Sequence, residues 1–365
     1  ASTAFRDFVV IDPLTYDTPR LSTEARLLST PEGIAVAFIC DHPSEEPRTR
    51  TMTERDARHF DSDYVSLMID FDGTGKLAYE FSVSLAGSYR DGTTTAKHSE
   101  NYDWDGFWER AVNEEPDRWT VEILLPWSIA IMRDTDGGNR LFGVSFQRGL
   151  YSKDETFAFP AINPDTARYI SEFSKLEVNG YAAQEFDIWP YATVVSDLVE
   201  NSTKGKAGLD LFWKPSNRFQ VAATLNPDFG HVESDELVIN FTAIETFFSD
   251  KRPFFTENQG IFNLSTAGSG GGRGGGSNGG GNLFYTRRVG GGSDDPDAAS
   301  DIDAALKVMG SSDHIDYGIF AATEADDAGR TFYAGRLTFP TEKWSLGAMS
   351  TYVDRPFLDR TALVN

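Results

Sequence analysis

Cysteine is almost absent from this 365-residue sequence, in which Cys40 is the only one. An intrachain disulfide and a metal site built on cysteines are therefore excluded. Cys40 ends the apolar run 34–40, which predicts a buried thiol rather than a nucleophile. Histidine is also scarce: five are scattered without a His-x-x-x-His or His-Glu-x-x-His spacing, so the sequence does not support a zinc hydrolase.

Basic residues are fewer than acidic ones. The chain has 33 Lys+Arg against 56 Asp+Glu, a net charge of -23. Nucleic acids and anionic membrane surfaces need a basic face, so the balance argues against both partners. No apolar run reaches the roughly 18 residues of a membrane helix. The sequence starts at Ala1 without a signal peptide, as a processed or truncated chain would.

Helical periodicity is sparse as well. Most segments are short, alternating or rich in Val, Ile, Phe and Tyr, which predicts an all-β protein. We expect residues 1–180 to form a β-sandwich of two packed sheets. Its predicted strands are 34–40, 64–71, 79–85, 119–125 and 142–148. Hydrophobic residues make up 40% of the chain and aromatic ones 13%, enough for a sizeable core.

The strands expected in residues 181–365 are longer and alternate more strictly. Aromatic residues such as Trp213 and Tyr352 gather near their ends. One apolar face, one polar or small face and aromatic ends are typical of the strands of a transmembrane β-barrel. A second soluble sandwich would alternate too, so the strands alone leave both open. Residues 268–282 are rich in glycine and predict a flexible loop.

The longest motif lies within residues 224–290. It contains Asn226-Pro227-Asp228-Phe229-Gly230, then Glu245-Thr246-Phe247-Phe248-Ser249-Asp250-Lys251-Arg252-Pro253-Phe254-Phe255, then Phe284-Tyr285-Thr286-Arg287-Arg288. This pattern closely resembles a large family of Gram-negative outer-membrane proteins of unassigned function. The resemblance implies that residues 181–365 are the N-terminal part of an outer-membrane β-barrel, with a strand that contains Tyr285, Arg287 and Arg288.

That family carries, upstream, a domain similar to the family-nine carbohydrate-binding module, a β-sandwich related to DOMON domains. The segments that fit this pattern are Asp61–Val65, Asp103–Glu109, Trp119–Ile123 and Pro126–Ser128. The module's opening Gly-x-x-Asp-Glu-x-x-Trp strand is missing, and the family's barrel continues well beyond the about eight strands counted here. We therefore expect a fragment cut at both ends, with an incomplete barrel.

A ligand site is predicted around Trp104 and Trp108. Aromatic faces stack on sugar rings, and the neighbouring carboxylates of Asp103, Asp105 and Glu109 accept hydrogen bonds from hydroxyl groups. The alternative is that one or both tryptophans pack in the core, because residues four apart on a strand point the same way. Trp127 is predicted to be core.

A structural calcium ion is the cofactor that the sequence suggests, whereas no residue is nominated as an axial ligand for the haem of some DOMON relatives. Asp70-x-Asp72-Gly73-x-Gly75 faintly resembles a calcium loop, since carboxylate oxygens suit Ca²⁺, but it lacks the bidentate glutamate. The alternative is a solvated acidic turn. Glycoside hydrolysis needs two carboxylates at a fixed separation, and the many acidic residues make a chance pair uninformative. No catalytic residue is predicted.

The basic pair Lys251–Arg252 lies among four phenylalanines. In a barrel, both side chains would pair with Glu245, Asp250 or Glu257 inside the lumen. As a bare motif the segment fits an aromatic belt at the membrane interface equally well. Within a barrel, we hypothesise an ordered internal segment that narrows or gates the pore.

Taken together, the sequence predicts an outer-membrane protein that binds or passes an extracellular ligand, with a glycan favoured. Its partners would be that ligand, outer-membrane lipid and a protein at the membrane. We expect the N-terminal domain on the periplasmic side. The competing classes are a secreted glycoside hydrolase with a targeting module and a surface assembly protein.

Overall fold

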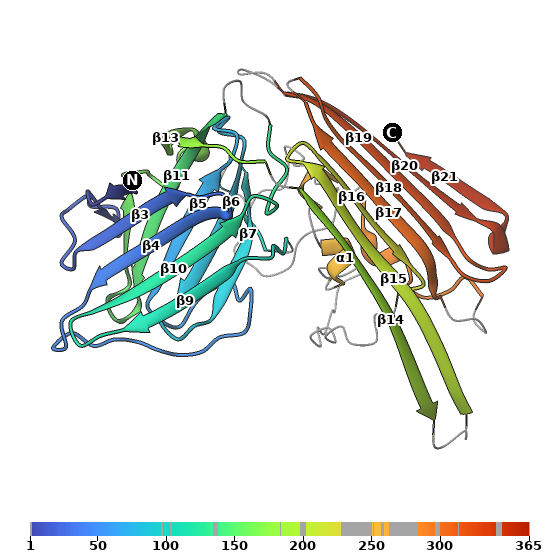
Figure 1. Cartoon of the computed structure of the whole chain (residues 1–365), viewed down its shortest axis with the longest axis horizontal. Coiled ribbons are helices and arrows are strands. Elements are labelled where there is room, and N and C mark those ends of the chain that lie inside the picture. The colour runs from blue at the N-terminus through green and yellow to red at the C-terminus, as the bar shows by residue number, and fades with distance from the viewer. Residues whose placement is uncertain are drawn as a thin grey trace. The chain divides into compact units, whose positions relative to one another are not determined.

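The computed structural model describes residues 2–95, 98, 100–102, 104–133, 138–182, 184–197, 202–227, 250, 252–256, 259–262, 284–295, 300–312, 314–340 and 345–364. The chain divides into two compact units, Ala1–Ala183 (unit 1) and Gln184–Asn365 (unit 2). Both consist of antiparallel strands (Figure 1), which confirms the all-β prediction. Among the described residues, no helix is long and apolar enough to cross a membrane.

Unit 1 contains two sheets. The first has the strand order β1 (Thr3–Phe5), β3 (Thr23–Ser29), β4 (Gly33–Asp41), β10 (Arg118–Pro126) and β9 (Glu109–Glu114). The second has the order β2 (Val9–Asp12), β12 (Glu155–Phe159), β11 (Asn139–Leu150), β5 (Tyr64–Asp70), β6 (Leu77–Ser84), β7 (Tyr89–Thr95) and β8 (Glu100–Asn101), and β13 (Ser174–Asn179) also pairs with β11. A β-sandwich fits this arrangement.

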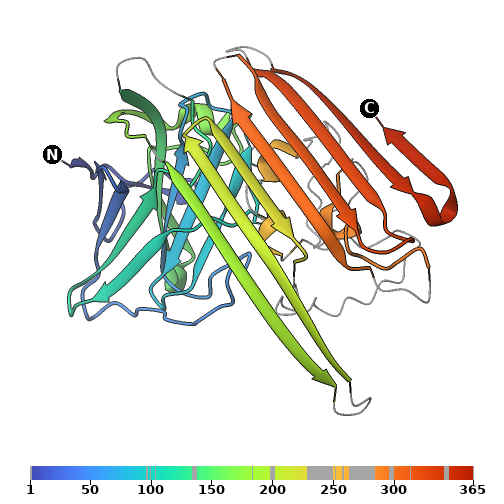
Figure 2. The ribbon, with the colours of Figure 1, turned by 45° about the vertical axis from the view of Figure 1, so that its right-hand side comes forward.

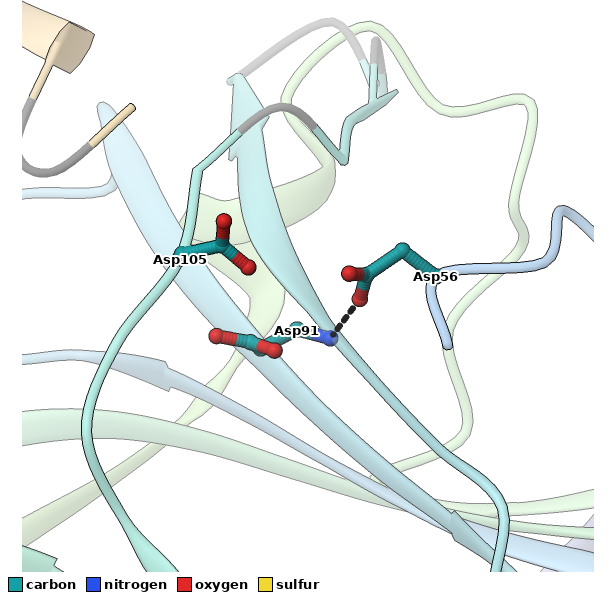
Figure 3. A group of neighbouring side chains, drawn as sticks. All are labelled: Asp56, Asp91 and Asp105. Carbon is teal, nitrogen blue, oxygen red and sulfur yellow. Dashed lines mark hydrogen bonds between the residues drawn. The ribbon is translucent and has the colours of Figure 1, made fainter. Parts of the chain in front are cut away.

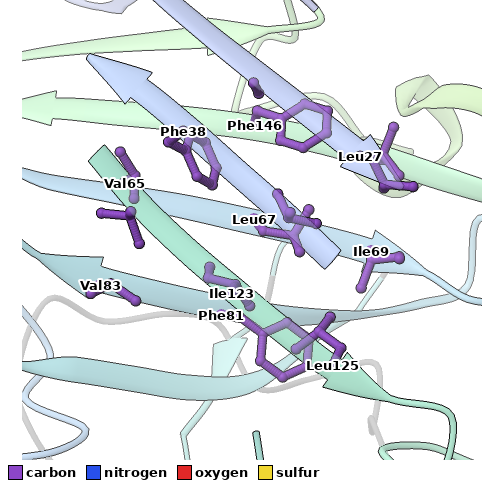
Figure 4. Close-up of a cluster of buried hydrophobic side chains, with 14 of the residues drawn as sticks. Leu27, Phe38, Val65, Leu67, Ile69, Phe81, Val83, Ile123, Leu125 and Phe146 are labelled. Carbon is purple, nitrogen blue, oxygen red and sulfur yellow. The ribbon is translucent and has the colours of Figure 1, made fainter. Parts of the chain in front are cut away.

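The core of unit 1 lies between these sheets (Figure 4). Leu27, Phe38 and Ile123 come from the first sheet, and Phe81 and Phe146 from the second. Side chains two apart on a strand share a face, so each strand gives alternate residues to this core. Cys40 is fully buried in it, and burial raises the pKa of its thiol to about 11, so the buried-thiol prediction is confirmed.

The other face of the second sheet is also covered in part. A second apolar cluster contains Met68 and Ala78 from strands β5 and β6, together with Ile162, Tyr169, Ile170 and Phe173. Tyr169 and Ile170 lie on the short 3₁₀ helix η2 (Tyr169–Glu172), and η1 (Tyr151–Lys153) follows β11. Polar residues that alternate with the core positions of this sheet are therefore removed from solvent.

Unit 2 is one sheet of eight strands in chain order, seen side by side in Figure 2. The strands are β14 (Glu185–Asp197), β15 (Ser202–Ser216), β16 (Phe219–Leu225), β17 (Ile302–Ser311), β18 (Asp316–Glu324), β19 (Thr331–Pro340), β20 (Ser345–Arg355) and β21 (Arg360–Val364). Within the described residues β14 and β21 do not pair with each other, so the sheet is not closed into a barrel.

One face of the unit 2 sheet is apolar and exposed. Directly paired residues share a face. This face therefore carries large side chains that are between 38 and 74% exposed: Phe186, Ile188, Val194, Trp213, Leu225, Leu306, Ile319, Tyr333, Leu337, Phe339, Leu346 and Leu363. The opposite face buries Lys214, Gln220, Thr224 and Lys307. This distribution is the reverse of that in a water-soluble sheet.

Short helical segments lie against the polar face. They are α1 (Pro253–Thr256), η3 (Gln259–Phe262) and η4 (Thr286–Arg288), whereas η5 (Pro356–Leu358) joins the last two strands. Phe255 packs on Phe320 of β18, with ring centroids 6.1 Å apart. The predicted strand at Tyr285–Arg288 is wrong, because Thr286–Arg288 forms a 3₁₀ turn. The predicted glycine-rich loop 268–282 lies outside the described residues.

Candidate functional site

A row of polar side chains crosses four strands on the outer face of the second sheet of unit 1. Arg90 of β7 is opposite Ser82 of β6, Ser82 is opposite Ser66 of β5, and Ser66 is opposite Gln147 of β11. Glu80 lies on the same face, two residues before Ser82. Strand β6 explains this placement, because its alternate residues Tyr79, Phe81 and Val83 turn to the core.

Glu80 and Arg90 form the charged centre of this row. Arg90 Nη2 donates to Glu80 Oε1 at 2.6 Å, and Ser82 Oγ donates to the same oxygen at 2.6 Å. Both charged residues are buried. Burial alone would lower the pKa of Arg90, but the Glu80 carboxylate raises it above its usual range. The guanidinium and the carboxylate therefore form a buried ion pair.

Aromatic rings surround the polar row. The Arg90 guanidinium lies 4.6 Å from the Tyr102 ring centroid and 5.2 Å from that of Phe60. At the other end of the row, Gln147 Nε2 donates to the Tyr169 hydroxyl at 3.0 Å. His98 stacks on the Tyr169 ring with centroids 4.0 Å apart. The row is thus a buried polar strip with aromatic side chains at both ends.

Three hydroxyl groups on this face have no hydrogen-bond partner. Ser66 Oγ, Ser84 Oγ and Thr94 Oγ1 are buried and unpaired within the described part of the chain. A buried hydroxyl without a partner costs about 1–3 kcal/mol, so such groups need an explanation. Ser66 is the most telling of them, because it lies between Ser82 and Gln147 in the polar row.

The predicted ligand residues are placed differently. Trp104 and Trp108 are buried in the core, where they contact Tyr79, Phe81 and Tyr89 edge-on. Both tryptophans therefore pack in the core, which is the alternative to ligand binding given in the sequence analysis. The segment that contains both is not a strand, because β9 begins only at Glu109.

The other residues of that predicted set are less buried. Glu109 is exposed, Asp105 is half-buried, and Asp103 lies outside the described residues. Trp127 is buried, as expected, and its Nε1 donates to Thr30 O at 2.8 Å.

Asp105 belongs to a group of three carboxylates that also includes Asp56 and Asp91 (Figure 3). The Asp91 backbone N–H donates to Asp56 Oδ1 at 3.1 Å, and the Gly106 N–H donates to Asp91 Oδ2 at 2.6 Å. The ligand atoms lie within 4.8 Å of one another, as around a cation. These contacts tie the segment that carries Trp104 and Trp108 to β7.

The cation among these carboxylates is Arg55. Its Nε lies 3.0 Å from Asp56 Oδ2, its Nη2 donates to Asp91 Oδ1 at 3.1 Å, and Nη2 also bonds Asp105. Burial, together with the neighbouring Asp91 charge, raises the pKa of Asp56 to about 7. Burial likewise raises the pKa of Asp91 to about 6. One guanidinium therefore offsets three carboxylates only in part.

The carboxylates predicted to bind calcium accept hydrogen bonds from N–H groups. Asp70 Oδ2 accepts from Gly75 N at 2.6 Å, and Asp72 Oδ1 accepts from Arg133 N at 2.9 Å. These bonds order the turn after β5, and Gly75 has φ +73° there, a conformation that favours glycine. The calcium ion itself stays a prediction.

The first motif of unit 2 forms a turn after strand β16. Asn226 ends β16 with φ 47°, which asparagine tolerates, and its Nδ2 donates to Ala207 O at 2.6 Å. Pro227 follows it, and Asp228 lies outside the described residues.

Arg252 joins two parts of the chain. It pairs with Asp250 at 2.6 Å and donates to Thr286 O and Val289 O at 2.9 and 2.6 Å. Arg287 and Arg288 lie on η4 within that second part. Lys251 lies outside the described residues. The Asp250 pairing expected for this motif is thus present for Arg252.

The Glu80–Arg90 row was missed from the sequence, although a signal was present. Glu80, Ser82 and Ser84 alternate with apolar residues, which is also the pattern of a solvated strand face. The cover over this face comes from residues 160–173, and no local pattern reveals it.

Comparisons with known proteins bear on each unit separately. Residues 185–315 match the family described as "Domain of unknown function (DUF5916)". No curated protein matches the chain.

Two solved structures resemble about half of the chain. One is a family 9 carbohydrate-binding module (CBM9) from Caldicellulosiruptor kristjanssonii in complex with cellotriose, with 12% identity, a TM-score of 0.34 and coverage of 49% of this chain and 83% of the module. The other is a putative carbohydrate-binding protein from Bacteroides uniformis ATCC 8492, with 14% identity, a TM-score of 0.37 and coverage of 48% and 87%.

Proposed function

We propose that unit 1 binds a glycan on the polar face that carries Glu80, Arg90, Ser66 and Gln147. The observation that carries this proposal is the combination of buried donors and acceptors with flanking aromatic rings. Sugar rings present apolar faces to aromatic side chains and hydroxyl groups at their edges, so they need both kinds of contact at once.

The charges of this face favour a neutral, hydroxyl-rich ligand. Glu80 and Arg90 are paired with each other, so neither offers an unpaired charge to an ionic ligand. A hydroxyl group donates one hydrogen bond and accepts others, which matches a guanidinium, a carboxylate and an amide set side by side. The unpaired Ser66 hydroxyl then has a natural partner in the ligand.

The Ser66→Ala variant tests this proposal. Calorimetry of the full chain with cellotriose, maltotriose and chitotriose measures binding, and Ser44→Ala, an exposed position, is the matched control. We expect one trisaccharide to bind, with about tenfold weaker binding for Ser66→Ala. Thermal stability should not fall, because the lost hydroxyl had no partner. Equal affinity for Ser66→Ala, or no binding of any trisaccharide, would contradict the proposal.

We further infer that the strands of unit 2 lie in a bilayer, as part of a barrel in the outer membrane of a Gram-negative bacterium, with unit 1 on the periplasmic side. The support is the reversed sheet, whose large apolar side chains are exposed while Lys214 and Lys307 are buried. Lipid is the partner that such an apolar face requires.

Two arginine substitutions separate lipid from water. Ile319 on the apolar face of β18 is 51% exposed, and Leu28 of β3 in unit 1 is 40% exposed. In water, arginine is tolerated at both positions. In a bilayer, Ile319→Arg costs about 2–4 kcal/mol, whereas Leu28→Arg is harmless.

The readout is the amount of protein in the outer-membrane fraction of native cells, followed by a gel run with and without boiling. We expect a heat-dependent shift for the wild type and for Leu28→Arg. Ile319→Arg should reduce the amount of folded protein in that fraction. A soluble wild-type protein without a shift would contradict the membrane proposal. The better hypotheses would then be a secreted binding protein, a secreted hydrolase or a surface assembly protein.

A further inference from the structure

Unit 2 contains a cavity of about 590 Å³ on the polar face of its sheet. It lies between residues 284–289 and strands β18–β21. Aromatic rings form much of its lining, among them Phe284, Tyr285, Phe320 and Phe332. Phe284 and Phe320 meet edge-on with centroids 4.9 Å apart. The volume lies within the roughly 300–1,000 Å³ of small-molecule sites.

Arginines supply the charged groups of the lining. Arg330 donates through Nε and Nη2 to Glu324, both at 2.7 Å, and Arg355 donates through Nε to Asp294 at 2.9 Å. These carboxylates hold the guanidiniums in place without lining the cavity themselves. Arg330 Nη1 lies 3.9 Å from Asp294 Oδ1, beyond hydrogen-bond distance, and Arg355 Nη1 makes no hydrogen bond to the described residues, so both N–H groups can still donate to a ligand.

Among the described residues, the polar lining is therefore rich in donors and includes no carboxylate. A sugar is a poor match, because its hydroxyl groups need acceptors as well as donors. A carboxylate only accepts, and arginine binds it through charge-assisted hydrogen bonds. The aromatic lining selects an apolar, planar body that packs on ring faces and edges.

We propose that this cavity binds a planar aromatic carboxylate, with the ring among Phe284, Phe320 and Phe332 and the carboxylate at Arg330 and Arg355. The site differs in position and chemistry from the polar face of unit 1. It does not depend on glycan binding there, so either proposal can fail without the other.

The probe is 2-naphthoate, with neutral 2-naphthamide as its matched control. Both are titrated into the full chain in detergent micelles and followed by calorimetry. We expect naphthoate to bind about tenfold more tightly than naphthamide, because only the carboxylate pairs with arginine. Non-specific partition into micelles, or onto the apolar face of the sheet, would not favour the charged naphthoate over the neutral naphthamide.

Variants of Arg355 and Phe332 locate the site. Arg355→Gln should remove most of the preference for naphthoate, and Arg355→Lys should restore part of it. Arg360→Gln on β21, which does not line the cavity, should have no effect. Phe332→Leu keeps every charge and should weaken both ligands, which gives a test if Arg355→Gln fails to fold.

Three results would overturn the proposal. Equal affinities of naphthoate and naphthamide would remove the role of the arginines. Unchanged binding by Phe332→Leu would remove the role of the aromatic lining. Displacement of naphthoate by maltotriose would show that the cavity takes sugars instead.

Discussion

Replacing Asp56 by asparagine is expected to stabilise unit 1 at pH 8 and to leave it unchanged at pH 4. An ordinary aspartate has a pKa of 3.8, whereas the pKa of Asp56 in the folded chain is about 7. The folded state therefore keeps a proton that the unfolded state releases between these values. The stability contributed by Asp56 is complete below pH 4 and is lost as the pH rises to 7.

The size of the effect follows from the contacts. A gap of about three pKa units corresponds to about 4 kcal/mol. Asparagine keeps an acceptor for the Asp91 N–H and, like the protonated carboxyl group, carries no charge. The pKa of about 7 already includes the attraction of Arg55, so we expect a net gain of up to about 4 kcal/mol at pH 8, measured as slower opening of β7.

Hydrogen exchange of the full chain, measured by mass spectrometry on peptides from β7, provides the assay. The variant and the wild type are compared at the same pH, so the intrinsic exchange rate cancels. Asp7→Asn, at an exposed carboxylate, is the control and should change nothing. Equal slowing of exchange at pH 4 and pH 8, or faster exchange in the variant at pH 8, would refute the titration of Asp56 as the cause.

Three further predictions follow from buried groups. Glu80→Ala leaves the Arg90 guanidinium buried without its carboxylate and should cost about 3–5 kcal/mol in denaturant unfolding, with a smaller loss for Glu80→Gln; equal losses would argue against the ion pair. Cys40 should resist iodoacetamide at pH 8 until the chain unfolds, because its pKa is about 11 and it is buried, and rapid labelling of the native chain would contradict this. Arg252→Ala removes the donors to Thr286 O and Val289 O and should speed chymotryptic cleavage at residues 284–295, and an unchanged cleavage rate would contradict this.

The strands of both units were largely predictable from the sequence, because a two-residue period is a local property. The apolar run that ends at Cys40 became β4, and the alternation around Phe339 became β19. The exception at Thr286–Arg288 has a physical cause. Arg252 binds the carbonyl oxygens of Thr286 and Val289, which a strand would give to its neighbours. That long-range contact has no local signal.

The candidate site was less predictable, since its groups come from distant parts of the chain. Asp105 was predicted as a ligand residue, but its companions Asp56 and Asp91 come from other segments, and only the fold sets Arg55 among them. In the sequence, Trp104 and Trp108 look like aromatic rings available to stack on a ligand, but a hydrophobic core needs the same aromatic rings. Composition cannot decide between these uses.

The two units show that alternation fixes which residues share a face and leaves open what lies against that face. In β6 the polar residues Glu80 and Ser82 are buried, because another segment of unit 1 covers them. In β17 the apolar Leu306 is exposed while Lys307 is buried. For a protein in water, hydropathy would turn β17 the wrong way, whereas in β6 it places Phe81 in the core correctly and misses only the segment that covers Glu80. These two departures are the grounds for the two proposals above: a ligand with hydroxyl groups for the polar face that is buried yet incompletely hydrogen-bonded, and lipid for the apolar face that is exposed over eight strands.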